Sequence, residues 1–167
     1  AMDGRSPEDI GTDRQLFVDD FWIAEARDVT RTMHHPERKE VAIAGEHPWE
    51  QRAIGCAGFM HDGDRFRAWY RCAVDEASIY CTAYAESIDG IHWEKPELGL
   101  FEFGGSKENN LVWMGPGTNL APFRDPNPDV PDDERYKGVA RTEGSMGSET
   151  LMALVSPDGI RWRLLVE

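Results

Sequence analysis

The sequence lacks several features that would place it in well-known classes of protein. It has no run of about 18 consecutive apolar residues, and its N-terminus lacks the basic-then-apolar order of a secretory signal. Basic residues are also few, because 18 Lys and Arg stand against 31 Asp and Glu, which gives a net charge of −13. Such a chain would repel the phosphate backbone of a nucleic acid, and the sequence has no basic stripe that could bind one. We therefore expect a soluble protein that binds neither nucleic acid nor membrane.

Cysteine is scarce, and the ligand patterns of metal and phosphate sites are missing. Cys56, Cys72 and Cys81 form an odd set without C-x-x-C spacing, which disfavours a disulfide framework and a thiolate zinc site. We expect buried free thiols, which fit a reducing compartment without fixing the location. The five histidines are scattered, and residues 115–117 lack the strand-to-helix context of a phosphate loop. The sequence therefore predicts no metal and no cofactor.

A pattern of residues recurs about 69 positions apart. Residues 87–93 read SIDGIHW and residues 156–162 read SPDGIRW. Residues 66–71 (FRAWYR) align in the same way with residues 136–141 (YKGVAR), 70 positions later. Since two separate blocks repeat together, we infer a structural unit of about 70 residues that occurs twice.

Each unit is expected to form four short strands, because apolar or alternating runs are separated by turn signals such as Asp-Gly. Proline and glycine (10 and 16 residues) recur through the chain, and helical periodicity of useful length is absent from the sequence. The expected strands are residues 54–60, 65–72, 78–86 and 91–94 in the first unit, and residues 120–123, 136–141, 150–155 and 160–166 in the second. The sequence therefore predicts an all-β protein.

The repeated Ser-x-Asp-Gly-x-x-Trp unit predicts a hairpin turn. Asp-Gly supplies the positive φ angles that a two-residue hairpin turn requires, and the Ser and Asp oxygens can accept hydrogen bonds from local amides. The Trp three residues later covers the turn with apolar surface. We therefore interpret Asp89 and Asp158, with Trp93 and Trp162, as structural and not catalytic.

Two four-stranded units in tandem are typical of a β-propeller, in which each sheet packs its face against the next blade. Because propellers close with about 4–8 blades, two units leave three alternatives: a piece of a longer propeller, several copies that assemble one, or two sheets stacked as a sandwich. We assign residues 1–15 to an N-terminal tail and residues 16–167 to the propeller segment, with blade-like repeats at about 50–100 and 115–167.

Three segments carry a family resemblance: residues 47–50 (HPWE), 57–71 and 84–93. They resemble the first blade of the five-bladed β-propeller glycosidases, the invertase, levansucrase and arabinanase group with the related mannoside phosphorylases. The likeness spans residues 16–166 and implies about two of five blades. It implies a glycoside hydrolase-like protein, or a fragment of one, that acts on a poly- or oligosaccharide, by hydrolysis or phosphorolysis. Sialidase-like propellers carry a similar aspartate box.

The same resemblance gives the first candidate for catalysis, Asp125. Residues 124–126 look like the Arg-Asp-Pro motif of the invertase-like enzymes, which place an active-site aspartate there. In the phosphorylases an Asp-Pro at a similar place donates the proton, so Asp125 would hold the substrate or supply the proton. Arg124 would bind substrate and keep Asp125 ionised. The alternative is turn chemistry, since residues 125–129 form a proline-rich loop.

The remaining candidates are an acidic pair and two tryptophans. Asp19 and Asp20 fall in residues 16–23, which read as a strand, so alternation lets at most one of them point into a pocket. Trp49 and Trp113 are expected in loops, where their faces could bind sugar rings. The Asn-Asp-Pro-Asn-Gly and Glu-Cys motifs that carry the invertase nucleophile and acid are missing from this sequence, which therefore does not supply a complete active site.

The rival hypothesis is a non-catalytic β module for carbohydrate or protein binding. An enzyme needs carboxylates that converge on one concave pocket, whereas a binding module would show an aromatic platform without a paired acid. An exposed blade face would indicate a homo-oligomer or a C-terminal remainder beyond this sequence.

Overall fold

The computed structural model describes residues 9, 11–16, 18–23, 25–74, 80–115, 117–143 and 149–165. The chain divides into two compact units, residues 1–39 and residues 40–167. In the described part of the first unit the backbone forms turns and irregular segments only. The prediction of a strand at residues 16–23 is wrong. The chain bends at residues 18–20, and the Ile23 N–H donates to the Asp20 carbonyl.

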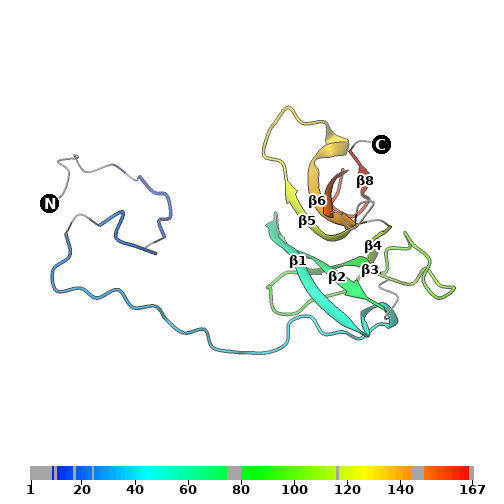
Figure 1. Cartoon of the computed structure of the whole chain (residues 1–167), viewed down its shortest axis with the longest axis horizontal. Helices are drawn as coiled ribbons and strands as arrows, with labels where there is room; N and C mark the ends of the chain where they lie inside the picture. Colours follow the sequence, from blue (N-terminus) through cyan, green and yellow to red (C-terminus); the bar gives the residue numbers. More distant parts are fainter. Residues whose placement is uncertain are drawn as a thin grey trace. The chain divides into compact units, whose positions relative to one another are not determined.

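The second unit is all-β, as predicted, and holds two four-stranded antiparallel sheets in which each strand pairs with the next along the chain (Figure 1). Sheet 1 consists of β1 (Ala53–Asp62), β2 (Arg65–Ala73), β3 (Tyr80–Ser87) and β4 (Leu111–Met114), and sheet 2 of β5 (Thr118–Arg124), β6 (Tyr136–Glu143), β7 (Glu149–Ser156) and β8 (Arg163–Leu164). Two 3₁₀ turns are also present, η1 (Pro48–Glu50) and η2 (Asp132–Glu134). Among the described residues, no helix has the length and apolar character needed to cross a bilayer.

The fourth strand of sheet 1 differs from the prediction. Of the expected strand at residues 91–94, only Glu94 pairs, in an isolated bridge with Glu86. Arg163 pairs with Val155 at the matching place in sheet 2, so both fourth strands start in the same position. Pro96 lacks the N–H that would continue the ladder, and residues 95–110 leave the sheet before the chain returns as β4. The first sheet therefore extends beyond residue 100.

Sheet 1 is buried on both faces, as the alternation along β2 requires. One face, which we call the covered face, carries Tyr70 and packs in one hydrophobic cluster. That cluster comprises Trp49, Ala68, Tyr70, Cys72, Cys81, Ala83, Ala85 and Leu111. Cys72 and Cys81 are buried free thiols, which confirms the prediction for these two, whereas the side chain of Cys56 lies outside the described residues.

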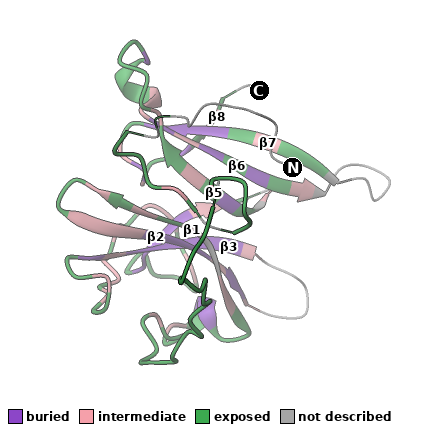
Figure 2. Cartoon of the chain, turned by 90° about the vertical axis from the view of Figure 1, so that its left-hand side faces the viewer, coloured by how far each residue is buried: buried purple, intermediate pink, exposed green. Residues whose placement is uncertain are grey.

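Sheet 2 packs on the other face of sheet 1, which we call the docking face, and Figure 2 shows the two sheets stacked. The docking face is formed by Met60, Arg67, Trp69, Tyr84 and Val112, and the contact face of sheet 2 by Leu120, Tyr136, Ala140, Leu154 and Trp162. The sheets approach closely at Gly58, where an added Cβ would lie 2.6 Å from Pro122 Cδ. Any larger residue at position 58 would therefore push the Pro122 ring away.

Both Asp-Gly turns form the hydrogen bonds expected from the sequence. Gly90 has a φ of 76°, and the Ser87 hydroxyl accepts from its N–H at 2.9 Å. Asp89 Oδ1 accepts from two following amides, and the Trp93 indole donates to the Gly90 carbonyl at 3.1 Å. The second turn repeats each of these bonds. The prediction of a two-residue hairpin turn is wrong, however, because residues 157–162 separate β7 from β8.

The second turn attaches sheet 2 to sheet 1. The Trp69 indole N–H donates to the Gly159 carbonyl at 2.7 Å, and Arg67 Nη1 donates to the Asp158 carbonyl at 2.7 Å. Trp69 is fully buried. Two side chains of β2 thus bind carbonyl groups that lie about 90 residues later in the sequence.

Trp69→Phe removes this indole donor and keeps an aromatic ring. We expect it to lower the free energy of unfolding by about 1–3 kcal/mol in urea denaturation. The control is Trp93→Phe, which removes the equivalent donor in the first turn, where the bond stays within one turn. An equal loss for the two variants would contradict the docking role of Trp69.

Candidate functional site

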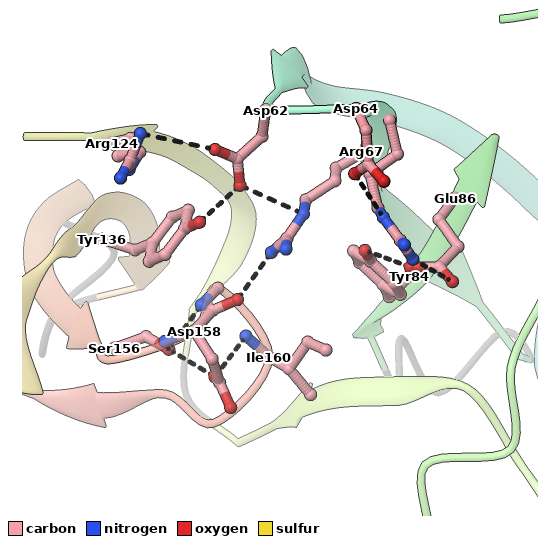
Figure 3. Close-up of polar contacts among 12 residues, drawn as sticks. Asp62, Asp64, Arg67, Tyr84, Glu86, Arg124, Tyr136, Ser156, Asp158 and Ile160 are labelled. Carbon is pink, nitrogen blue, oxygen red and sulfur yellow. Dashed lines mark hydrogen bonds and ion pairs between the residues drawn. The ribbon is translucent and has the colours of Figure 1, made fainter. Parts of the chain in front are cut away.

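A buried carboxylate, Asp62, lies where the two sheets meet. It ends β1, and its side chain is 8% exposed. The Tyr136 hydroxyl donates to Asp62 Oδ2, and Arg67 Nε lies 3.2 Å from the same oxygen. Arg124 Nη1 lies 3.8 Å from Asp62 Oδ1 (Figure 3). Two guanidinium groups and a hydroxyl therefore surround the carboxyl group, and each sheet supplies part of the cluster.

Asp125 occupies the equivalent position in sheet 2. Its N–H donates to the Arg135 carbonyl, which matches the pairing of Asp62 with Arg65. Lys137 Nζ lies 2.7 Å from Asp125 Oδ2, and Lys137 corresponds in the repeat to Arg67. Each sheet therefore pairs a carboxylate at the end of its first strand with a cation on its second strand. We call these the Asp62–Arg67 pair and the Asp125–Lys137 pair.

The contacts of Asp125 bear on the role that it could play. Lys137 and the Asn127 N–H lower the pKa of Asp125 below its ordinary value, so the group is ionised at neutral pH. An ionised carboxylate suits holding a hydroxyl or a cation better than donating a proton. Arg124, expected to keep Asp125 ionised, instead forms its ion pair with Asp62. The Asn127 N–H bond to Asp125 Oδ1 is also the turn chemistry expected as the alternative.

Asp19 and Asp20 belong to the first unit, where both residues are exposed. Asp19 Oδ1 accepts from the Phe21 N–H, and Arg31 Nη1 lies 2.7 Å from Asp20 Oδ1. Their recorded contacts are therefore those of a local turn and an exposed ion pair, which contribute little to stability.

The two tryptophans expected in loops are not in loops. Trp49 lies in η1 and is buried, with its indole N–H donating to Asn110 Oδ1 at 3.0 Å. Trp113 lies in β4 and packs half-buried against the core between the sheets. Trp49 therefore offers no open ring face to a sugar.

A buried acid, Glu50, fixes the covered side of sheet 1. Burial alone would raise the pKa of Glu50, but hydrogen bonds from Tyr70, Glu46, Lys95 and His47 hold it below its ordinary value. The Tyr70 hydroxyl donates at 2.7 Å and Lys95 Nζ at 2.9 Å. Every described contact of Glu50 is thus a bond inside the protein, which marks it as structural and attaches residues 40–52 and 95–110 to the covered face.

A cavity of about 340 Å³ lies beside the first Asp-Gly turn. It is lined by Arg65, Glu86, Ser87, Ile88, Asp89, His92 and Glu94. Glu86 and Glu94 exchange both backbone hydrogen bonds, at 2.9 and 2.8 Å, so they are direct partners across an antiparallel bridge. Direct partners present their side chains on one face, which explains why both line the same cavity.

The polar groups of this cavity are held in place by ion pairs and hydrogen bonds. Arg65 Nη1 lies 3.0 Å from Glu86 Oε1, and the Tyr84 hydroxyl donates to Glu86 Oε2 at 2.9 Å (Figure 3). His92 Nδ1 lies 2.7 Å from Asp89 Oδ2, which raises the pKa of His92 and lowers that of Asp89. Both donors and acceptors therefore line the cavity, and Arg65, Glu86, Asp89 and His92 are held by bonds to one another or to Tyr84.

The sequence contained only weak signals for these groups. Residues 61–64 were interpreted as a turn, although Asp62 ends an apolar run much as Asp125 does. Glu86 and Glu94 flank the repeated motif on both sides, and that symmetry predicts their pairing across the turn.

No protein-family model matches the chain, and comparison with the curated proteins finds no match either. Within the part of the chain that the structure describes, no three His, Cys, Asp or Glu side chains converge as metal ligands. The function therefore has to be argued from the Asp62 cluster and the cavity.

Asp62→Asn tests whether the Asp62 cluster holds the sheets together. Removing the charge leaves Arg67 and Arg124 without their partner, so we expect a loss of about 3 kcal/mol in the free energy of unfolding. Asp125→Asn is the matched control, and its more exposed pair predicts a much smaller loss in the same urea titration. Equal losses would contradict the distinction between the two pairs.

Proposed function

We propose that this chain is the carbohydrate-binding part of a glycoside hydrolase-like protein, and that the sugar binds in the cavity of Glu86 and Glu94. A volume of about 340 Å³ suits a small ligand. Sugar hydroxyls both donate and accept hydrogen bonds, and the cavity offers Arg65 and His92 as donors with Glu86, Asp89 and Glu94 as acceptors. This mixture of fixed polar groups carries the proposal.

The positions of these groups favour binding over a merely solvated surface. Arg65 and Tyr84 hold both oxygens of Glu86, and Asp89 orients the His92 ring. Groups that are already ordered lose little conformational freedom when a ligand binds. The stacking of two repeated meander sheets supports the propeller fold that the resemblance implies, with the cavity at the turn of its first blade.

Glycosidic-bond hydrolysis is a second candidate, favoured by the direct pairing of Glu86 with Glu94. Direct partners in an antiparallel bridge carry their side chains next to one another on one face, which brings the two carboxyl groups into the same cavity. Two carboxyl groups about 5–5.5 Å apart serve retaining enzymes, and about 6.5–9.5 Å apart inverting ones. In that reaction Glu94 would be the acid that protonates the leaving oxygen. Glu86, held by Arg65, would be the base that takes a proton from the attacking water, whose hydroxyl completes the cleaved sugar.

Calorimetric titration with fructan-, arabinan-, xylan- and mannan-derived oligosaccharides tests the proposal. We expect one class to bind, and Glu86→Gln to weaken that binding at least tenfold because it removes the anion that Arg65 and Tyr84 hold. The exposed Glu102 provides the matched control Glu102→Gln, which should leave affinity unchanged.

Asp125→Asn separates the two candidate sites in the same titration. The cavity proposal predicts that this variant binds like the unaltered chain. Loss of binding in Asp125→Asn, with Glu86→Gln unaffected, would move the site to the Arg-Asp-Pro motif. Failure of all four oligosaccharide classes to bind would contradict the proposal itself.

Release of new reducing ends distinguishes hydrolysis from binding alone. If the two glutamates act together, Glu94→Gln retains binding and stops the release. Binding without release in the unaltered chain would contradict the hydrolytic candidate and leave the binding module.

A further inference from the structure

The face of sheet 2 that points away from sheet 1 is largely exposed and carries apolar side chains. We call it the outer face, and its side chains are those of Ala121, Phe123, Lys137, Val139, Arg141, Leu151, Ala153 and Val155, of which Val155 is buried. Leu151 is 77% exposed, Phe123 48% and Val139 41%. Exposed apolar side chains gathered on one sheet face are typical of an interaction surface.

The outer face is the repeat equivalent of the docking face of sheet 1. Trp69 and Tyr84 are cross-strand partners on the docking face, and both are fully buried under sheet 2. Val139 and Ala153 are cross-strand partners at the same places in sheet 2, 70 and 69 positions later. Smaller apolar side chains without the indole donor therefore occupy the same places in sheet 2, and in the described structure they have no cover.

The polar part of the interface is also repeated. On the docking face, Arg67 donates to the Asp158 carbonyl and Asp62 accepts from the Tyr136 hydroxyl. On sheet 2 the Asp125–Lys137 pair holds the same positions, with side chains 16% and 31% exposed. The Lys137 ammonium carries three N–H donors, and its described bond to Asp125 uses one of them, so it can also donate to a turn carbonyl.

The opposite end of the stack is mostly covered. The covered face of sheet 1 packs against Trp49, Phe101 and Phe103, and the bonds of Glu50 fix the segments that carry them. It is open around Phe59, which is 58% exposed beside a cavity of about 200 Å³. In a second copy of this chain the contact face of sheet 2 is occupied already, so another copy does not offer the face that fits the outer face.

We propose that the outer face of sheet 2 is the docking site for a third four-stranded sheet of the same repeat. Its Ser-x-Asp-Gly-x-x-Trp turn would lie over Lys137, with a turn carbonyl accepting from Lys137 Nζ and a tyrosine hydroxyl donating to Asp125. Its apolar side chains would cover Phe123, Val139 and Leu151. This inference rests on the repeated contacts and not on sugar binding.

The test supplies the third sheet from the chain itself, by adding a second copy of residues 115–165 after residue 167. Ala153→Cys in the original sheet reports on the outer face through its rate of reaction with a thiol reagent. We expect the added sheet to slow this reaction at least tenfold. Ser106→Cys, exposed in the loop next to sheet 1, is the control and should react equally fast with and without the added sheet.

Lys137→Glu in the extended chain tests the polar contact. It replaces the donor with a carboxylate that repels the turn carbonyl, so the thiol introduced by Ala153→Cys should react rapidly again. Far-ultraviolet circular dichroism confirms that each variant is folded, and a raised melting temperature of the extended chain supports docking independently.

Two results would overturn the proposal. The first is rapid reaction of the Ala153→Cys thiol in a folded extended chain, which would mean that the added sheet leaves the outer face open. The second is a dimer of the unextended chain, measured by light scattering, in which this thiol is already protected. In that case a second copy of the chain is the occupant. Neither result affects the oligosaccharide titration, so the two proposals fail separately.

Discussion

The contact of Trp69 with the second Asp-Gly turn is the interaction on which the rest of the second unit depends. The indole is fully buried and donates to the Gly159 carbonyl, while Arg67 donates to the carbonyl before it. These bonds place the contact face of sheet 2 on the docking face of sheet 1. Only then do Tyr136 and Arg124 reach Asp62. A local turn motif thus determines how two sheets far apart in sequence are stacked.

The same turn motif has two different roles in this chain. Both copies form the same internal hydrogen bonds between Ser, Asp, Gly and Trp. The second copy packs against sheet 1, where Gly159 is buried against Trp69. The first copy stays accessible, so Asp89 and His92 border a cavity with the paired glutamates. An identical scaffold therefore provides a structural joint in one sheet and a candidate binding site in the other.

Local sequence signals predicted the strands and turns, whereas contacts distant in sequence decided the candidate site. The Asp-Gly turns and the alternation along β2 depend on neighbouring residues, so both could be predicted. Trp49 was expected to have an open ring face because the neighbouring residues predict a loop. Its partner Asn110 lies 61 positions away, so the local sequence gives no sign of this contact. Asp62 was missed for the same reason, since two of its partners come from sheet 2. The break after Glu94 had a local signal in Pro96, but β4 was not predicted.

Hydrogen exchange of the Trp69 indole N–H, followed by nuclear magnetic resonance, measures most directly whether the second turn joins the sheets. If the turn is docked as described, this proton exchanges only when the chain unfolds globally, with a protection free energy equal to the free energy of unfolding. The Trp93 indole, bonded within its own turn, exchanges through local opening and gives the comparison. Exchange of the Trp69 proton as fast as that of Trp93 would contradict the stacking of the two sheets.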